Sequence, residues 1–426
     1  MSTVRDRGAS SPQLLRRANR QALLQHALGA GSFTAADAMA ATGLTRATVL
    51  GVCAELAQAG VLDEVAAARE DGAVQRGRPA RHYALREAAA VLIGVDAGQH
   101  TLRARVTDLR GDELAVAWSA ADGELDSTDA EKGAAAAEAR VGAVRDLIDE
   151  ALSRAGASRA RRLLTVVGVP APVDAAGYSP SGGSAYWSAM NPGFVEALDG
   201  EVLVENDANL AVLAEQAAER AQAGPRTEHL AALLMGERFG AGLIVDGRLL
   251  HGAEGGAGEM RFLDSVLGES RGAEGVAALA RRWSLEALEA SVADGAPVAD
   301  GVSEAASSLA SIPSERLTAE DVFAAAAAGD PLARQVLERI ADRLARIAAI
   351  LSSLLGVEEV VVAGGIAAAI EPVLARSRAL LPEHTAPPLP WLTASTLGRD
   401  VVVRGAIDLA LSRLRENPLD LLVPEP

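Results

Sequence analysis

The pattern of the chain changes at about residue 86, and this change constrains the fold more than any other feature. Residues 1–86 hold 11 arginines, no lysine and seven acidic residues, which gives a formal charge of +4. The remaining residues carry −21, so the total of −17 conceals a basic head on an acidic body. Such asymmetry is typical of a separate nucleic-acid-binding module. We therefore predict two parts, residues 1–86 and residues 87–426.

The head has the pattern of a helix-turn-helix. Leu14–Leu28 places apolar residues near helical spacing, with arginines on the other face. A second short helix follows, Gly43 supplies a tight turn, and Thr45 can cap a third helix. In a helix-turn-helix, the first residues of the last helix lie against base edges. Those residues here are Thr45, Arg46 and Thr48, which can bind phosphates or bases.

A basic loop between two strand-like segments follows this helix. The segments are Val61–Glu64 and His82–Leu85, and Arg76, Arg78 and Arg81 lie between them. Arginines in such a wing can reach phosphate or the minor groove. The alternative is an ordinary three-helix unit with surface arginines. The wing and the positive charge together favour a winged helix-turn-helix DNA-binding domain.

Beyond the head, strands alternate with helices, as in an α/β fold. The buried strand Val91–Asp96 ends at a glycine-containing turn, where backbone N–H groups can meet phosphate and Asp96 can hold Mg²⁺. The segment Asn206–Asn209 follows another strand and precedes a helix predicted over Leu210–Ala223. A carboxylate such as Asp207 near a helix N-terminus can accept a proton from a hydroxyl group. Asp96 and Asp207 could also simply close a turn and cap a helix.

Glycine-rich turns recur along the body, at Gly236–Gly242, Gly252–Glu259 and Val360–Gly365. Glycines allow a nucleotide to approach the backbone closely. In this order the motifs resemble the ROK family, which groups sugar-responsive transcriptional repressors with sugar kinases of the glucokinase type. The resemblance covers nearly the whole chain. It implies an α/β fold class: an N-terminal winged helix-turn-helix, then a two-lobed actin-like (RNase H-like) sugar-kinase fold with a sugar cleft between the lobes.

The resemblance also implies which residues bind ligands. Asn206 and Asp207 match residues that bond sugar hydroxyls, and Asp207 matches the catalytic base of the kinases. Glu259 matches a further sugar ligand, and Glu274 and Asn191 are looser matches to two more. The nucleotide-binding positions of the family correspond to Asp96, Gly98, Gly236, Gly240, Gly364 and Gly365.

The chain departs from the kinase pattern at both phosphate-binding turns. It has Gly98-Gln99-His100 where kinases of the family have a Gly-Gly-Thr type turn, and Gly236-Glu237-Arg238 where they have Gly-Thr-Gly. The arginine removes a close backbone approach, and the glutamate brings a carboxylate toward the phosphates. Like charges about 4 Å apart repel by on the order of 1–4 kcal/mol. We expect nucleotide binding to be lost, with Arg238 gripping phosphate as the alternative.

The zinc site of the family is also missing from the sequence. Members that have it carry a histidine three residues after the sugar-binding glutamate, and then three cysteines. This chain has Phe262 at the histidine position, and Cys53 is its single cysteine. A site of that form cannot be built. We expect no metal and no other resident cofactor.

The sequence gives no sign of secretion or of a membrane span. Its first residues contain no apolar run, and the most apolar stretch, Ile347–Ile370, is interrupted by Glu358 and Glu359. A single cysteine fits a reducing compartment. We expect a cytoplasmic protein that does not bind membranes.

These observations favour a DNA-binding transcriptional regulator, with repression expected, that senses a sugar or sugar derivative. We expect a homodimer or a dimer of dimers, which would place recognition helices on the half-sites of operator DNA. The alternative is an ATP-dependent sugar kinase with an appended head, in which Asp207 is the base and Mg-ATP the co-substrate. A third possibility is a body that only dimerises and binds no ligand.

Overall fold

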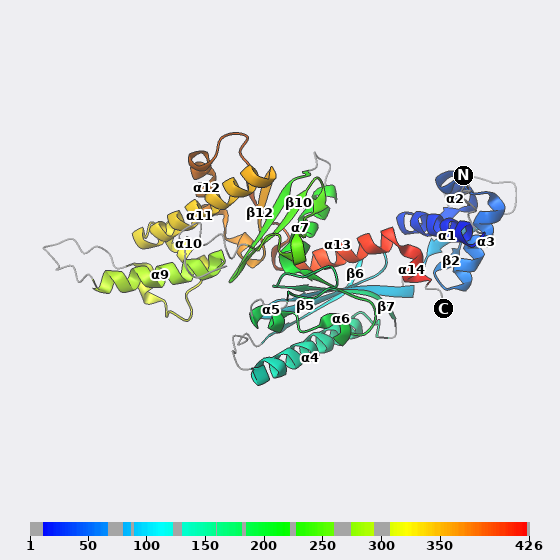
Figure 1. Cartoon of the computed structure of the whole chain (residues 1–426), viewed down its shortest axis with the longest axis horizontal. Coiled ribbons are helices and arrows are strands. Elements are labelled where there is room, and N and C mark those ends of the chain that lie inside the picture. The colour runs from blue at the N-terminus through cyan, green and yellow to red at the C-terminus, as the bar shows by residue number, and fades with distance from the viewer. Residues whose placement is uncertain are drawn as a thin grey trace, which may run out of the picture.

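The computed structural model gives the arrangement of most of the chain (Figure 1). It describes residues 12–66, 80–86, 89–121, 130–158, 160–180, 185–221, 227–259, 274–293 and 307–423. A small head lies at one end, and two sheets with their helices form the body beside it.

The head consists of helices and one small sheet. Its elements are α1 (Pro12–Gly29), β1 (Phe33–Thr34), α2 (Ala35–Thr42), α3 (Arg46–Gln58), β2 (Leu62–Val65) and β3 (His82–Leu85). The three strands are antiparallel, in the order β1-β3-β2. The predicted sequence of helix, turn, helix and two-stranded wing is therefore present, with β1 as a third strand that the sequence analysis did not predict.

Local side-chain chemistry sets the ends of the head helices. Thr34 and Asp37 form a capping box at the start of α2. Gly43 ends α2 in the left-handed conformation, with φ +70°, which glycine adopts without steric cost. The Thr45 hydroxyl accepts from the backbone N–H of Thr48 and caps α3. The turn between α2 and α3 is thus fixed at both of its ends.

The first sheet of the body has the order β6-β5-β4-β7-β8. Its strands are β4 (Ala90–Ala97), β5 (Thr101–Thr107), β6 (Glu113–Ala120), β7 (Arg161–Val169) and β8 (Val202–Asn206). Strands β4, β5 and β6 are antiparallel, whereas β7 runs parallel to β4 and β8. With α4 (Ala130–Arg154), α5 (Ala185–Met190) and α6 (Phe194–Ala197), this sheet forms the first lobe.

The second sheet repeats the same topology, in the order β11-β10-β9-β12-β13. Its strands are β9 (Leu230–Met235), β10 (Phe239–Val245), β11 (Arg248–Leu249), β12 (Glu359–Ala363) and β13 (Trp391–Ala394). The second lobe adds α9 (Val276–Ala293), α10 (Ala319–Ala328), α11 (Pro331–Leu355) and α12 (Glu371–His384). Single turns of 3-10 helix occur at Ala253–Gly255, Ser308–Ser311, Gly365–Ala368 and Gly398–Asp400.

Two helices, α7 (Asp207–Ala221) and α13 (Val401–Glu416), pack against each other between the two sheets. Helix α7 covers β9 and β10, and α13 covers β4 and β7. The backbones approach closely, because a Cβ at Gly405 would lie 1.8 Å from the carbonyl oxygen of Leu210. Helix α7 begins at Asp207, three residues before the predicted start, because the Asn206 side chain already accepts from the first N–H groups of the helix.

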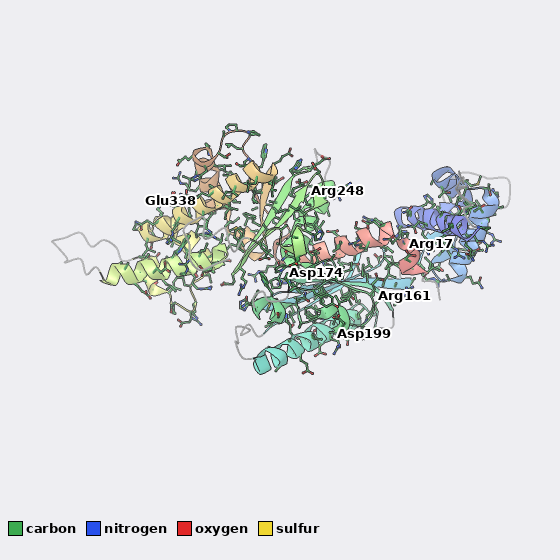
Figure 2. The ribbon with its side chains drawn as sticks, in the orientation of Figure 1. Arg17, Arg161, Asp174, Asp199, Arg248 and Glu338 are labelled. Carbon is green, nitrogen blue, oxygen red and sulfur yellow. The ribbon has the colours of Figure 1, made fainter. Side chains whose placement is uncertain are left out.

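The head docks on the end of the chain, at α13 and α14 (Pro418–Leu422) (Figure 1). Arg17 of α1 pairs with Asp420, and the Gln21 side chain donates to the Glu416 carbonyl at 2.8 Å. From the body, Arg161 donates to the carbonyls of Leu421 and Leu422 at 2.5 and 2.9 Å. Arg17 and Arg161 therefore reach α14 from opposite sides (Figure 2). Leu23 and Leu419 belong to one continuous apolar cluster, which joins the head to the body.

Among the described residues, no helix is long and apolar enough to cross a membrane.

Candidate functional site

A cleft of about 220 Å³ opens between the two lobes. The first lobe contributes the turn after β4, Pro170, two aromatic residues of α5 and the start of α7. The second lobe contributes the turn between β9 and β10 and the carboxylate of Glu259. The cleft-lining residues are Gly98, Gln99, His100, Pro170, Tyr186, Trp187, Asn206, Asp207, Leu234, Gly236, Glu237, Arg238, Phe239, Gly240 and Glu259.

The junction between β8 and α7 fixes the polar end of the cleft. Asn206 donates from Nδ2 to the Ala171 carbonyl at 3.0 Å, and its Oδ1 accepts from the N–H groups of Ala208 and Asn209. Asp207 is the first residue of α7, and its Oδ1 accepts from the N–H of Ala208 at 2.8 Å. The hydrogen bonds of the Asn206 side chain thus stabilise the junction itself. Asp207 keeps one carboxylate oxygen for other contacts.

Three carboxyl groups lie close enough to affect one another. Burial raises the pKa of Asp207 well above its ordinary value, and the nearby carboxylates of Asp96 and Glu259 raise it further. Burial also raises the pKa of Asp96 to about 7, against the opposing effect of Arg103 and Arg140. A carboxyl group with a raised pKa can take up and release a proton near neutral pH.

Arg140 of α4 stabilises the turn after β4 by donating hydrogen bonds to backbone carbonyls. It donates to the carbonyls of Ala97, Gly98 and Met190, the last two at 3.2 and 3.3 Å. Burial lowers the pKa of Arg140 to about 10. This role of Arg140 could not be predicted from the sequence, because its place in a long polar helix gives no signal of the carbonyls that it contacts.

A second missed contact ties the helix start to the loop that carries Glu259. Glu205 is buried and accepts at Oε1 from the N–H of Asn206 and from the Asn209 side chain. Its Oε2 accepts from His251 Nε2 at 2.8 Å, and this hydrogen bond raises the pKa of His251. The sequence gives no signal for His251, because no cluster of ligating residues surrounds it there.

The turn between β9 and β10 is held by ion pairing. Glu237 forms a bidentate ion pair with Arg281 of α9, with N–O distances of 3.0 and 2.7 Å. The backbone of the turn also bonds to the start of α9, and a Cβ at Gly275 would lie 2.1 Å from the Gly236 carbonyl oxygen. The predicted carboxylate is therefore present at this turn, neutralised by Arg281.

Arg238 spans the cleft. Its guanidinium lies over the ring of Tyr186, 3.4 Å from the ring centroid, which is a cation–π contact. The Tyr186 hydroxyl in turn donates to Gln99 Oε1 at 3.3 Å. Gln99 and Arg238 belong to the two turns that hold phosphate in the kinases of the resemblance, so Tyr186 connects these turns directly. The Arg238–Tyr186–Gln99 contacts thus run from one turn to the other along the wall of the cleft.

The structure brings six of the predicted ligand-site residues into the cleft lining: Gly98, Asn206, Asp207, Gly236, Gly240 and Glu259. Asp96 lies behind this lining, where it acts on Asp207. Asn191 is buried and donates to the Gly177 carbonyl and the Ser179 hydroxyl. Glu274 pairs with Arg282 at 2.7 Å.

The double-glycine turn after β12 also lies outside the cleft lining. Gly364 adopts φ +89°, and the side chain of Arg399 lies 3.4 Å from the position of a Cβ at Gly365. Asn191, Glu274, Gly364 and Gly365 thus do not line the cleft in this arrangement of the lobes.

The predicted DNA-contacting residues of α3 lie on the surface of the head. Thr45 and Arg46 are exposed, and Thr48 is half-buried. The Thr45 and Thr48 hydroxyls lie 2.9 Å apart in a hydrogen bond. Arg81, at the base of the wing, pairs with Glu64 at 3.1 Å. Arg76 and Arg78 lie outside the described residues.

Metal ligands were predicted to be absent. Within the described ranges, no group of three or more His, Cys, Asp and Glu residues could hold a metal ion. Phe262 and the segment in which the family carries its zinc-binding residues lie outside those ranges. Cys53 is buried in the core of the head, and burial raises the pKa of its thiol to about 11.

The sequence matches known proteins over much of its length. The family model described as ROK family matches residues 92–413. A glucokinase of Halalkalibacterium halodurans is 31% identical over 178 residues, which cover 41% of this chain and 51% of that protein. A glucokinase of Thermotoga maritima is 31% identical over 221 residues, which cover 50% of this chain and 67% of that protein. The chain thus spans about half to two thirds of the length of these curated relatives.

Two solved structures illustrate the similarity of fold. A ROK family transcriptional regulator, a homologue of the E. coli MLC protein, gives a TM-score of 0.65 at 22% identity and covers 93% of this chain and 96% of that chain. A ROK family glucokinase from Streptomyces griseus, in complex with glucose and AMPPNP, gives 0.54 at 23% identity and covers 75% of this chain and 99% of that chain. The regulator structure covers the larger share of this chain.

Proposed function

The chain belongs to the ROK family, and from this premise we propose that it is a DNA-binding transcriptional regulator, with repression as its mode. Its head binds operator DNA through α3 and the wing, and its interlobe cleft binds a sugar or sugar derivative. It acts as a homodimer or a dimer of dimers, because two-fold symmetry places two recognition helices on matching half-sites.

The contact of Arg238 with Tyr186 carries this proposal. It joins the two turns between which a kinase must place a phosphate tail. The cleft nevertheless keeps Asp207 and Glu259, whose carboxylates can bond sugar hydroxyls. Carboxylates that can bond sugar hydroxyls, beside a contact that joins the two turns, favour sensing over phosphoryl transfer.

The head supports the same proposal through its charge and exposure. Arg46 projects from the N-terminal turn of α3 with its side chain exposed, in the position that reads base edges in a helix-turn-helix. The acidic body repels DNA, which leaves the head as the docking face.

Ligand binding can reach the head through helices that pack on one another. Asp207 begins α7, α7 packs on α13, and the end of α13 and α14 carry the head. A sugar that binds one arrangement of the lobes more tightly would shift the population toward it and so move the heads. A ligand without this preference would leave DNA binding unchanged.

The proposal is tested by gel shift with a duplex enriched from random DNA by the full-length protein, at one fixed salt concentration. Arg46→Ala should weaken binding by about 1–3 kcal/mol, which is roughly fivefold to 150-fold. Arg248→Ala removes an equal charge from an exposed site on β11 of the body and should bind as the unaltered protein does. Equal affinity of the two variants would contradict the proposal.

A sugar kinase is the outcome that would overturn the proposal for the body. A coupled assay of ADP release with a panel of hexoses and amino sugars should give no turnover above background. Turnover that Asp207→Asn abolishes would show that the protein is a working kinase.

A further inference from the structure

The loop that carries Glu259 contacts both lobes. It begins at His251, two residues after β11 of the second lobe. Its middle packs so closely on the first lobe that a Cβ at Gly255 would lie 2.0 Å from the Val173 carbonyl oxygen. It returns to the second lobe at Gly258, whose carbonyl accepts from an N–H of β10 at 3.2 Å. The position of Glu259 in the cleft therefore depends on how this loop lies between the lobes.

A hydrogen-bonded pair joins the start of this loop to the first lobe. His251 Nε2 lies 2.8 Å from Oε2 of Glu205, which is the last residue but one of β8. Oε1 of the same carboxylate accepts from the N–H of Asn206 at 2.8 Å and from Asn209 Nδ2 at 2.9 Å. One carboxylate thus bonds both to the junction of β8 with α7 and to the loop.

The two partners of this pair differ in their contact with water. The Glu205 side chain is 9% exposed, whereas the His251 side chain is 52% exposed. A buried carboxylate oxygen that loses its donor costs free energy, because water does not replace the lost bond. The hydrogen bond to Glu205 raises the pKa of His251 above its ordinary value of 6.5. The histidine therefore gains and loses its proton while it faces a carboxylate that stays in place.

We propose that the Glu205–His251 pair is a proton-dependent contact between the lobes that positions Glu259 against Asp207. With His251 protonated, a charge-assisted bond holds the loop to the first lobe, and loss of the proton leaves at most a neutral bond. Neither partner is among the cleft-lining residues, so both act as positioning residues. The inference rests on the proposed function, since it concerns the regulation of the proposed sugar site.

Three further charged groups belong to the elements that meet at this pair. Arg413 of α13 acts on His251 and, with partial burial, opposes the effect of Glu205 on its pKa. Asp207 follows Glu205 by two residues at the start of α7, and Glu254 is exposed in the loop. Because the pKa of His251 is raised in the folded chain, the charged pair is fully formed below 6.5. It is lost as the pH rises through the pKa of the folded chain.

The first test is amide hydrogen exchange of the full-length protein without ligand, at about pH 6 and about pH 8.5, corrected for the intrinsic rate at each pH. The N–H of Ala257 is the reporter, because it donates to the His251 carbonyl at 3.0 Å. It should exchange roughly twofold to fivefold faster at the higher pH, as expected for a half-exposed ion pair. His251→Phe should exchange fast at both pH values. His251→Gln keeps a neutral N–H donor and should give one rate at both.

The matched control is His384→Phe, since His384 bonds to Asp342 at the same 2.8 Å within the second lobe. This variant should leave exchange at Ala257 unchanged. Equal exchange at Ala257 in His251→Phe and His384→Phe would overturn the proposal. A pH effect that persists in His251→Gln would also overturn it, because the titrating group would then be another one.

The second test measures the pKa of Asp207 by carbon-13 NMR of labelled aspartate carboxyl groups, assigned with Asp207→Asn. Burial is the main cause of the raised pKa of Asp207, and the carboxylates of Asp96 and Glu259 raise it further. If the loop moves away in His251→Phe, the pKa of Asp207 should fall, and His251→Gln should restore it. A pKa of Asp207 that is the same in all three proteins would overturn the positioning of Glu259.

Neither measurement uses a sugar or DNA. A failure here therefore leaves the proposed function standing, and a chain that binds no sugar would still return these results.

Discussion

At the scale of single residues, the cleft depends on carboxyl groups that the fold keeps partly out of water. Asp207 could be predicted from the sequence, because its place after a strand and before a helix is a local pattern. Two of its neighbours could not: Arg140 and Tyr186 reach the site from α4 and α5. Their roles arise from contacts between residues 40 or more positions apart, which no local pattern encodes.

Asp96 gives a prediction about stability and pH. Its pKa is raised from 3.8 to about 7 in the folded chain, so between these values the folded state holds a proton that the unfolded state has lost. Stability should therefore fall as the pH rises from about 4 to about 7 and stay lower above that range. Asp96→Asn should remove this cost, which is on the order of a few kcal/mol at pH 8.

Thermal unfolding at a series of pH values measures this effect. The melting temperature of Asp96→Asn should exceed that of the unaltered protein at pH 8, and the two should converge toward pH 4. A lower melting temperature for the variant at pH 8 would mean that the contacts of Asp96 with Arg103 and Arg140 outweigh the cost of burying its charge.

At the scale of elements, the sequence predicted those helices and strands whose periodicity and turn residues form a local pattern. The winged helix-turn-helix, the strand β4 and the turn after β12 all lie where the pattern placed them. The strand β1 has only two residues and gives no periodic signal. The docking of α1 on α14 joins residues 403 positions apart and could not be read from spacing.

The contact between α5 and the turn after β9 gives a prediction about lobe motion. Arg238→Ala removes the cation–π contact across the cleft, which is worth about 0.5–2 kcal/mol, so the lobes should open more often. Amide exchange in α5 and in the β9–β10 turn should become faster. Arg339→Ala is a matched control, since Arg339 lies over the Trp283 ring at 3.8 Å within the second lobe. Equal exchange at the cleft in both variants would contradict the bridging role of Arg238.

At the scale of the whole molecule, the opposed charges of head and body assign them different tasks. The net charge of −17 alone argues against DNA binding, and only its division at residue 86 reverses that inference. The repeated five-stranded topology explains how one chain builds two lobes around α7 and α13. The sequence motifs pointed to this architecture, but the contact of Arg238 with Tyr186 across the cleft became visible only in the folded chain.

The most direct test of the account is enrichment of duplexes from a random DNA pool by the full-length protein at one salt concentration. We predict one sequence with two-fold symmetry, whose half-sites lie about one helical turn or a multiple of it apart. Arg46→Ala should fail to enrich it, and Arg248→Ala should enrich it normally. A pool that stays random through repeated rounds, or an asymmetric site that Arg46→Ala enriches equally well, would contradict the account.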